Sequence, residues 1–387
     1  MANVSSSNGI EKYPKLRFPE FTEPWRDIKL SDVSSYRNKR TTVSKVKYVS
    51  TENMLQNYAG LEPYTEDIET DGIAIFCNDT LLANIRPYLK KVLKSEFNGA
   101  CSTDVLAFSP EQINPDFLYS LIAQDKFIDY VMSGAKGSKM PRGDKSHIMD
   151  YATSIPTEEE QQKISSFVEL INNRIAAQTY YIELLKKYKR GLNIRLLSGI
   201  SMSYSKRLGD VCSIIGGGTP DTTTAKFWDG GINWFTPSEI GKTKYVVSSL
   251  RSISYDGMLK SSAKLLPQNT VLLTTRATLG EMSILQSEAT TNQGFQSLIP
   301  SEEILAEYVY YLQVIIKPWC EKYASGNTFR EISKSALSNC LIPVPDISTQ
   351  NKLVRVLSGI DQHIEHEKDI LDKLRDQKKA LLQQLFI

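Results

Sequence analysis

The chain has 387 residues, 41% of them hydrophobic and 23% charged, which is typical of a folded globular protein with about two domains. Its formal net charge of +2 neither indicates nor excludes a nucleic-acid ligand, because such binding depends on how the charge is distributed. Five cysteines without a Cys-x-x-Cys spacing argue against a zinc site or a disulfide framework and favour a reducing, cytoplasmic location.

The first part of the chain predicts a tail followed by a globular domain. Residues 1–13 are polar and lack the apolar core of a signal peptide, so we expect a disordered tail. No run in the chain approaches the roughly 20 apolar residues of a membrane span. A first domain is expected over 14–156, with short strand-like runs such as 73–76 and a helical stretch over 115–131.

A long helix is predicted over 157–198. Thr157 and Glu160 have the spacing of a capping box at its start. Apolar residues recur along it in alternating steps of four and three, the pattern of a coiled-coil seam, and only Gln178 and Lys189 interrupt them. A seam this narrow suits a single partner helix better than a globular core. The seam residues are Ile164, Val168, Ile171, Ile175, Ile182, Leu185, Leu192 and Leu196.

The rest of the chain predicts the same two parts again. A second globular domain is expected over 199–345, with a strand-like run over 271–275 and a helical stretch over 303–323. A second long helix is expected over 346–387, with Ser348 or Thr349 as its cap. Its seam is interrupted by Glu367 and Lys378 and consists of Leu353, Leu357, Ile360, Ile364, Leu371, Leu374, Leu381 and Leu385.

The two halves are copies of each other. The Pro156 to Gln161 segment lines up with Pro345 to Gln350 at an offset of 189 residues, and Ser133-Gly134 lines up more loosely with Ser325-Gly326. The linker over 198–204 is short, which favours antiparallel helices, since a parallel pair would need a long return connection. We therefore predict a mixed α+β fold with an internal pseudo-twofold repeat: two domains, each followed by a long helix, with the helices paired as an antiparallel coiled coil. The alternative is two ordinary amphipathic helices, each packed on its own domain.

Several motifs, taken in order, resemble those of the DNA specificity subunits of type I restriction–modification enzymes. They are PKLRFPEFTEPW over 14–25, IRPY over 85–88, CSTD over 101–104, GGTP over 217–220, WDGGINW over 228–234, TPS over 236–238 and the two Pro-x-x-x-x-Gln helix starts. The resemblance implies two target-recognition domains that each read half of a split DNA site. It also implies that the long helices dock two methyltransferase subunits, through which nuclease–translocase subunits join.

The same resemblance implies that the chemistry lies in the partners. Adenine N6 would be methylated from S-adenosylmethionine by the methyltransferase, and the nuclease partner would use ATP and Mg²⁺, so we expect no cofactor in this chain. The sequence agrees, because it has no Gly-rich strand–helix turn for S-adenosylmethionine and no Asn-Pro-Pro-Tyr-type motif. Gly216 to Pro220 could form a phosphate cradle, but a turn is favoured because no Gly-Lys-Ser or Gly-Lys-Thr follows. His147 lacks a partner nucleophile, and His363 and His366 lack a third metal ligand, so no catalytic or metal residue is expected.

DNA-binding residues are expected in the basic loops, because proteins hold phosphates with Lys, Arg and backbone N–H groups and read bases with polar side chains. For each loop the alternative is a solvated basic surface, and Arg86 or Arg276 could instead pair with a carboxylate. The candidates are Arg37, Lys39, Arg40, Arg86, Lys136, Lys139, Arg142, Lys145, Arg276, Asn327, Thr328, Arg330 and Lys334.

Three other functions stay open from the sequence. The chain could be a coiled-coil scaffold that binds proteins and not DNA, or a sequence-specific DNA-binding protein without methyltransferase partners. It could also be a self-sufficient methyltransferase, which the missing motifs disfavour. A steep dependence of DNA binding on salt would exclude the scaffold.

Overall fold

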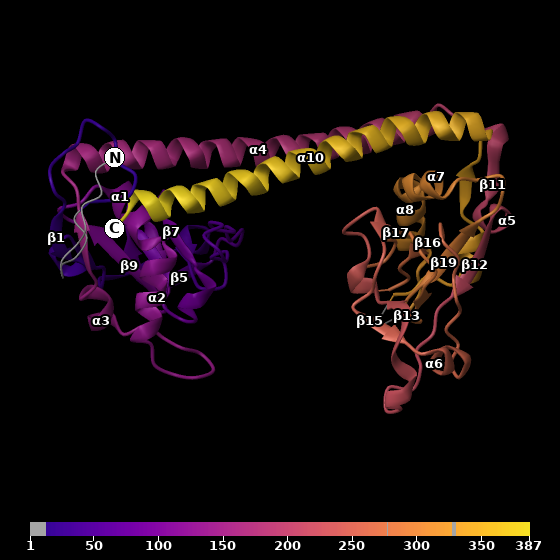
Figure 1. Cartoon of the computed structure of the whole chain (residues 1–387), viewed down its shortest axis with the longest axis horizontal. Coiled ribbons are helices and arrows are strands. Elements are labelled where there is room, and N and C mark those ends of the chain that lie inside the picture. Colours follow the sequence, from indigo (N-terminus) through magenta and orange to yellow (C-terminus); the bar gives the residue numbers. More distant parts are fainter. Residues whose placement is uncertain (1–12, 277, 327–329) are drawn as a thin grey trace. The chain divides into compact units, whose positions relative to one another are not determined.

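The computed structural model describes residues 13–276, 278–326 and 330–387. The expected tail therefore lies outside the described residues except for Tyr13, and so do the candidates Asn327 and Thr328. The chain folds into two compact units. The first comprises the residues up to Thr179 together with Ile370–Ile387, and the second comprises Tyr180–Asp369. Each unit thus contains a globular part and one end of each long helix (Figure 1).

The globular part of the first unit is a mixed α/β structure with two small four-stranded sheets and one two-stranded pair. One sheet has the order β2 (Ser34–Tyr36), β9 (Val105–Pro110), β6 (Thr80–Ala83), β7 (Val92–Lys94). The other has the order β3 (Arg40–Ser44), β5 (Glu69–Ile75), β8 (Gly99–Cys101), β4 (Tyr48–Val49). The pair joins β1 (Arg26–Lys29) to β10 (Ala152–Ile155) in antiparallel register.

Three short helices complete this part: α1 (Pro115–Ile122), α2 (Asp125–Ser133) and α3 (Lys145–Met149). The single helix expected over 115–131 is therefore two helices. Gln124 between them is extended, and its side chain donates a hydrogen bond to the Ser120 carbonyl at the end of α1 (3.0 Å). The break leaves Phe117 and Phe127 both buried in the core of the unit.

The globular part of the second unit repeats this plan, with more residues between the two strands of its two-stranded pair. Its two-stranded pair joins β11 (Ser205–Arg207) to β20 (Leu341–Pro343). A five-stranded sheet has the order β12 (Cys212–Gly216), β19 (Gln296–Pro300), β16 (Val271–Leu273), β17 (Met282–Leu285), β14 (Tyr245–Val246). A three-stranded sheet has the order β15 (Arg251–Ile253), β13 (Trp228–Phe235), β18 (Thr290–Thr291).

The short helices of the second unit are α5 (Leu208–Val211), α6 (Tyr255–Leu259), α7 (Ala306–Tyr311), α8 (Gln313–Tyr323) and α9 (Lys334–Ser338). The helix expected over 303–323 is again divided, with Leu312 between α7 and α8. Residues 303–305 of the expected helix are not helical, and α7 begins after Leu305.

The two long helices are α4 (Glu158–Ser198) and α10 (Ile347–Leu385). In the first unit, the start of α4 and the end of α10 share one core, through Ile164, Val168 and Leu385. In the second unit, the end of α4 shares a core with the start of α10, through Leu197, Leu353 and Leu357. The helices therefore run antiparallel, and the predicted α+β fold with a long antiparallel helix pair is confirmed.

Both helix starts differ in detail from the predicted caps. The Glu160 amide lies 3.4 Å from Thr157 Oγ1, but the Glu160 carboxylate is buried against Arg17 and does not return to the cap, so the capping box is only half formed. At the start of α10 the cap is Asp346, and not Ser348 or Thr349. Asp346 Oδ2 accepts the Thr349 hydroxyl (2.7 Å) and Oδ1 accepts the Thr349 amide (3.0 Å), and these bonds lower the pKa of Asp346.

Candidate nucleic-acid interface and helix junctions

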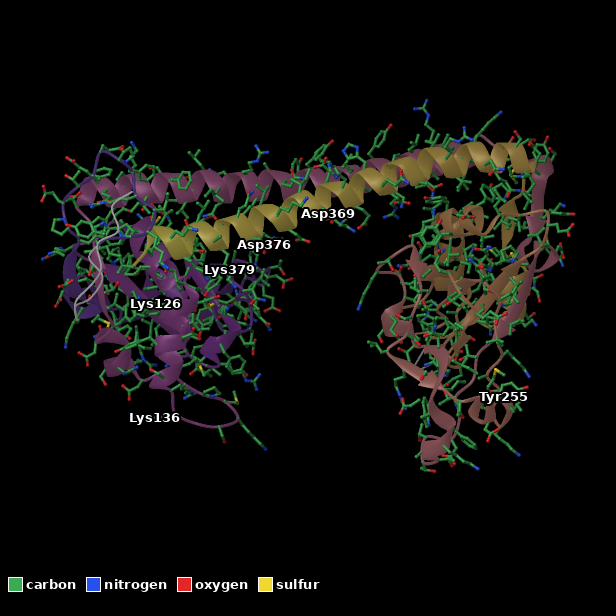
Figure 2. All side chains as sticks on the ribbon, in the orientation of Figure 1. Lys126, Lys136, Tyr255, Asp369, Asp376 and Lys379 are labelled. Atoms are coloured by element: carbon green, nitrogen blue, oxygen red, sulfur yellow. The ribbon has the colours of Figure 1, made fainter. Side chains whose placement is uncertain are left out.

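A loop of the same length lies between two short helices in each unit, α2 and α3 in the first and α8 and α9 in the second. In the first unit the Lys136 and Arg142 backbones exchange two hydrogen bonds of 2.9 Å, and Ser325 and Glu331 do the same in the second (3.0 and 2.9 Å). Within the first unit, Lys136 lies at the end away from the long helices (Figure 2).

The loops correct one part of the sequence alignment. Gly137 and Gly326, each following the first bridging residue, have positive φ values of 97° and 120°. The left-handed conformation favours glycine, so these glycines are the equivalent pair. Ser325-Gly326 thus corresponds to Lys136-Gly137 at the offset of 189 found for the helices, and not to Ser133-Gly134. Lys145 and Lys334, the first residues of α3 and α9, obey the same offset.

The loop of the first unit carries cations with different surroundings. Lys136 pairs with Asp144 (2.8 Å), and this bond holds the pKa of Asp144 far below its usual range. Arg142 pairs with Asp104 (3.0 Å). Lys139 is exposed and has no acidic partner among the described residues, which leaves its charge available to a ligand.

Arg86 is brought next to this loop, and Lys145 lies near β2. Arg86 is exposed, and its amide donates to the Pro141 carbonyl (2.8 Å). The ammonium of Lys145 lies 5.9 Å from the centre of the Tyr36 ring. The structure therefore gathers five of the candidate cations of the first unit in one region: Arg86, Lys136, Lys139, Arg142 and Lys145.

The candidates of the second unit are more firmly held. Arg276 lies 3.8 Å from Glu331 and donates to the Gln293 carbonyl (3.2 Å), so it has a carboxylate neighbour. Arg330 donates to the Glu321 carbonyl (2.6 Å), in the last turn of α8, where a cation stabilises the helix end. Lys334 is exposed. Of these three, Lys334 is the side chain with neither a carbonyl nor a carboxylate partner among the described residues.

Arg37 differs from its neighbours Lys39 and Arg40. Its guanidinium makes two-pronged hydrogen bonds of 3.0–3.3 Å to Asp79, whose side chain is 1% exposed, and it lies over the Phe76 ring (4.7 Å). Lys39 and Arg40 are exposed at the start of β3. The geometry of Arg37 is that of a structural ion pair, while Lys39 and Arg40 face solvent.

Gly216 ends β12, and residues 217–220 continue as a closely packed irregular segment and not as the turn that the sequence favoured. A Cβ on Gly217 would lie 2.0 Å from the Asn292 carbonyl oxygen, and one on Gly218 would lie 2.2 Å from Ser262 Oγ. The Gly218 carbonyl accepts the indole N–H of the buried Trp234 (2.9 Å). The glycines are therefore required by the approach of neighbouring chain segments.

The Pro-x-x-x-x-Gln spacing that both helix starts share has the same role in both units. Gln161 and Gln350 are 4% and 0% exposed. Each donates its side-chain amide to the carbonyl of the proline five residues earlier, Pro156 (2.9 Å) or Pro345 (2.8 Å). Each also accepts the backbone N–H that precedes a short helix, from Asn114 or Leu305 (both 2.9 Å). Through these hydrogen bonds, the two glutamines connect the long helices to the globular parts.

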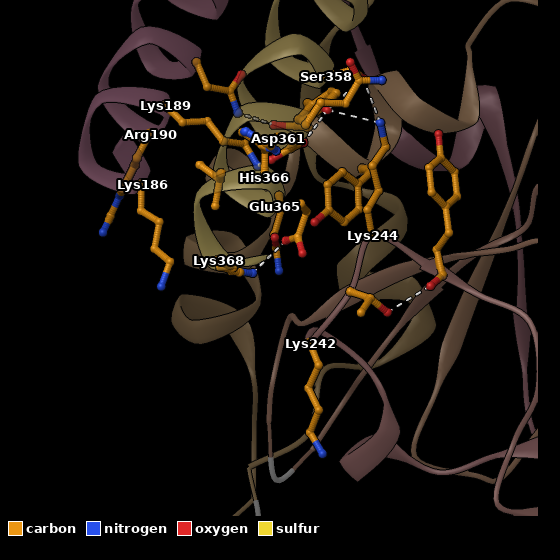
Figure 3. Close-up of a pocket in the computed structure, with 18 of the residues that line it drawn as sticks. Lys186, Lys189, Arg190, Lys242, Lys244, Ser358, Asp361, Glu365, His366 and Lys368 are labelled. Carbon is orange, nitrogen blue, oxygen red and sulfur yellow. Dashed lines mark hydrogen bonds and ion pairs between the residues drawn. The ribbon is translucent and has the colours of Figure 1, made fainter. Parts of the chain in front are cut away.

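A polar junction in the second unit joins the globular part to both long helices (Figure 3). Lys244 donates to Ser358 Oγ of α10 (2.9 Å) and to the Tyr311 hydroxyl (3.1 Å). Tyr311 donates to Asp361 (2.6 Å), which also pairs with Lys189 of α4. Burial lowers the pKa of Lys244. The sequence identified Lys189 as an interruption of the seam, but nothing in the sequence marked Lys244.

The cavity beside this junction has a volume of about 850 Å³ and is lined by more cations than carboxylates. The cations are Lys186, Lys189, Arg190, Lys242, Lys244 and Lys368, and the carboxylates are Asp361, Glu365 and Asp369. The lining therefore suits an anion better than a cation.

Among the described residues of the first unit, the second interruption of the seam has no counterpart of this network. Lys378, equivalent to Lys189, is half-buried, and burial lowers its pKa. Positions 172 and 122, equivalent to Asp361 and Tyr311, hold Asn172 and Ile122. Lys378 is therefore a half-buried cation without an acidic partner among the described residues.

Substitutions of these two lysines should have opposite effects. Lys378→Leu should stabilise the first unit by about 1 kcal/mol, since it removes a desolvated charge and buries apolar surface. Lys189→Leu should destabilise the second unit by about 1–3 kcal/mol, because Asp361 loses its cation.

Because the pKa of Lys378 is lowered in the folded state, the unfolded chain binds its proton more tightly. The stability of the unsubstituted chain should therefore rise with pH just below the ordinary lysine pKa, and Lys378→Leu should reduce that slope. Calorimetric unfolding at several pH values measures both effects, and changes of the same sign would contradict the assignment.

No feature of a catalytic site arises among the described residues. His147 Nε2 lies 3.2 Å from Ser133 Oγ, so the histidine does have a hydroxyl neighbour, but that hydroxyl donates to the Tyr130 carbonyl (2.7 Å). His363 pairs with Glu367 one turn along α10 (3.1 Å). Within the described ranges, no group of three His, Cys, Asp or Glu side chains is placed to hold a metal ion. Nor does that part of the chain contain a helix long and apolar enough to cross a bilayer.

Comparisons with known proteins agree on one family. The family model described as the type I restriction modification DNA specificity domain matches the chain twice, over residues 22–186 and 203–376. The chain is 35% identical over 176 residues to the type I restriction enzyme MjaIX specificity subunit of Methanocaldococcus jannaschii, covering 44% of this chain and 41% of that protein. It is 27% identical to the EcoprrI specificity subunit of Escherichia coli, over 42% and 43% of the two chains. These matches thus span less than half of each relative.

Other matches extend over nearly the whole chain. The MjaVIII specificity subunit of Methanocaldococcus jannaschii is 22% identical over 96% of this chain and 94% of that protein. A chain from a structure of the assembly and conformational transition of the type I R-M system has a TM-score of 0.63 and 21% identity, covering 93% and 97% of the two chains. The type I restriction–modification S subunit of M. genitalium has a TM-score of 0.50 and 15% identity, covering 97% and 99%. These two structures share the fold of the chain.

Proposed function

The chain belongs to the type I restriction–modification DNA specificity family, and we propose that each of its units reads one half of a split DNA site. The observation that carries the proposal is the duplication. Both units have the same two-stranded pair, the same glutamine-anchored helix start and the same closed loop. Two similar units that differ in the side chains of their loops are suited to two different half-sites.

The DNA surface that we propose includes the loop over 136–142 in the first unit and its equivalent in the second. Lys39, Arg40, Arg86, Lys139 and Lys334 are exposed without a described acidic partner, which suits contacts to phosphate. We leave Arg37 out of this proposed surface, because its guanidinium is held by Asp79. Arg276 and Arg330 would shape the surface through their carbonyl and carboxylate contacts.

The partners that we propose follow from the twofold repeat. Two equivalent helix surfaces would dock two methyltransferase subunits, and nuclease–translocase subunits would join through them. The methyltransferase would supply S-adenosylmethionine and methylate adenine N6, and the nuclease partner would use ATP and Mg²⁺. In this proposal the chain supplies specificity only, and it works where the cellular DNA is, in the cytoplasm.

Methylation mapping tests the proposal directly. A host carrying this chain and its methyltransferase should show a methylated site with two specific halves separated by an unspecific spacer. Replacing residues 14–153 with the corresponding domain of another family member should change one half only. If both halves changed, the two units would not act as separate modules. If the purified chain transferred methyl groups alone, the proposal of a non-catalytic subunit would be wrong.

A single lysine tests whether the loop of the first unit touches DNA. Lys139→Ala should weaken binding to all DNA sequences alike and reduce the slope of log affinity against log salt by about one, because one phosphate contact is lost. Lys126→Ala is the matched control, since Lys126 is also exposed but lies on α2, outside the loop. Titrations at several salt concentrations measure the slope. Equal slopes for Lys139→Ala and the unsubstituted chain would show that Lys139 in this loop does not contact DNA phosphate.

A further inference from the structure

In the first unit, a segment of the chain fills the groove between the start of α4 and the end of α10. The Leu16 amide donates to the Gln384 carbonyl in the last turn of α10 (2.9 Å). The Phe18 ring packs edge-on against Phe167 of α4, with ring centres 6.0 Å apart. Phe18 thus packs on the apolar surface between the two helices, while the Leu16 side chain is 39% exposed.

Two ion pairs hold this segment in its groove. Arg17 makes two hydrogen bonds of 2.7 Å to Glu160, whose side chain is only 1% exposed. Glu20 pairs with Lys163 of α4. The segment therefore presents apolar Leu16, aromatic Phe18 and the carboxylate of Glu20 at alternate positions. The cation of Arg17 lies between the first two.

The second unit has the same groove, and no described residue occupies it as Phe18 occupies the first. A groove of about 520 Å³ lies between the end of α4 and the start of α10. Six of its lining residues stand 189 positions from residues of the filled groove: Leu192, Arg195, Leu196, Thr349, Lys352 and Val356 correspond to Leu381, Gln384, Leu385, Glu160, Lys163 and Phe167. Val356, which takes the place of Phe167, is 48% exposed.

The chain cannot fill this second groove in the way it fills the first. Ser205 of β11 pairs with Pro343 as Asp27 of β1 pairs with Ser154, so Ser205 and Asp27 are equivalent. Residues 199–204 are all that separates β11 from α4. The positions equivalent to residues 16–18 therefore fall within α4 itself, and the linker contributes to the groove through its lining residues Gly199 and Ile200.

The charges around the second groove indicate what can bind there. Arg195 and Lys352 line it, are exposed and have no acidic partner among the described residues. The lining contains no carboxylate, and Thr349 replaces Glu160. A segment like residues 15–20 of a second copy would therefore bring Lys15 and Arg17 to a cationic surface without their acceptor. A segment with apolar side chains and a carboxylate would meet both the apolar floor and the cations.

We propose that this groove binds a segment of the methyltransferase partner that carries two apolar side chains followed by a carboxylate. The identity of the partner rests on the proposed function, whereas the chemistry of the segment rests on the groove. The first unit covers its own groove, so this contact would exist at one end of the helix pair only. It would distinguish two otherwise equivalent methyltransferase subunits.

Charge reversal and an apolar-to-acidic change in the groove test the proposal. Lys352→Glu and Val356→Asp should each weaken binding of the methyltransferase subunit by tenfold or more, measured by calorimetric titration. Arg355→Glu on the same helix is the matched control, because Arg355 is exposed and does not line the groove. Unchanged affinity for both variants, in a chain that still assembles with the methyltransferase, would overturn the groove proposal alone. A chain that binds no methyltransferase would overturn both the groove proposal and the proposed function.

Photocrosslinking in the assembled complex identifies the occupant. A benzoylphenylalanine at position 356 should link to a methyltransferase peptide that contains apolar residues and Asp or Glu. The same residue at position 167 is the internal control and should link to the chain's own segment around Phe18. A link from position 356 to a second copy of this chain, or to residues 1–12, would overturn the assignment.

Discussion

Replacing Arg37 with alanine is expected to destabilise the first unit by about 3 kcal/mol, the low end of the ~3–5 kcal/mol range for breaking a buried ion pair. Asp79 is 1% exposed and would remain as a buried carboxylate without its cation. Its remaining described partner would be the Phe76 amide (2.8 Å). The estimate takes the low end because the Arg37 side chain is 33% exposed, so solvent already screens part of the interaction.

Arg40→Ala provides the comparison, because Arg40 lies three residues away and is exposed. It should change stability by no more than about 0.5 kcal/mol, and under the proposed function it should weaken DNA binding. Urea unfolding followed by titration with DNA separates the two effects. An Arg37→Ala chain with ordinary stability and weaker DNA binding would restore Arg37 to the DNA surface and contradict the structural role.

The long helices could be predicted from sequence because they depend on one periodicity repeated over many residues. Apolar residues recur at alternating steps of four and three from Ile164 through Ile182 to Leu196, and this spacing makes one face of the helix apolar. Every seam position of both helices is buried or half-buried in the structure. The repeat with offset 189 was recognisable for the same reason. The Pro–Gln spacing could be found in the sequence because it is local: each glutamine donates a hydrogen bond to a carbonyl only five residues earlier.

The candidate site was less predictable, because its charges are assigned by contacts distant in sequence. Arg37 and Asp79 are 42 residues apart, and nothing near Arg37 distinguishes it from Arg40. Lys244 and Ser358 are 114 residues apart. A basic cluster shows that cations are close together in the chain, but not which of them already have a partner in the fold. The loop alignment failed for a related reason: the sequence offers a Ser-Gly pair in both halves, while the backbone bridge selects Gly137.

Lengthening both long helices by one heptad is expected to lengthen the spacer of the recognised DNA site by about three base pairs. Each unit holds one end of both helices, so the connections between the units cross at Thr179–Tyr180 in α4 and at Asp369–Ile370 in α10. These two points are about 190 residues apart and lie at matching places in the repeat, between the seam positions 178 and 182 and between 367 and 371. Seven residues inserted at each point keep the alternation of four and three.

The size of the effect follows from the two helical geometries. Seven residues add about 10 Å at roughly 1.5 Å per residue, which matches about three base pairs at roughly 3.4 Å each. Three base pairs also rotate the second half-site by around 100°, given about 10–10.5 pairs per turn, so DNA binding is expected to weaken while the half-sites themselves stay the same. Insertion away from the junctions leaves the contacts of Lys189 with Asp361 and of Leu16 with Gln384 intact, and the protein should fold.

Methylation mapping of the double insertion measures the spacer, and a four-residue insertion in α4 alone is the control. Four residues shift the seam of one helix against the other and should destabilise the chain, because apolar positions then meet polar ones. A well-folded double heptad insertion that methylates the original spacer would mean that the helix pair does not set the distance between half-sites. In that case the two units would have to reach DNA by movement at the junctions around Gln161 and Gln350, and the polar contacts there would become the next place to look for the determinant of spacing.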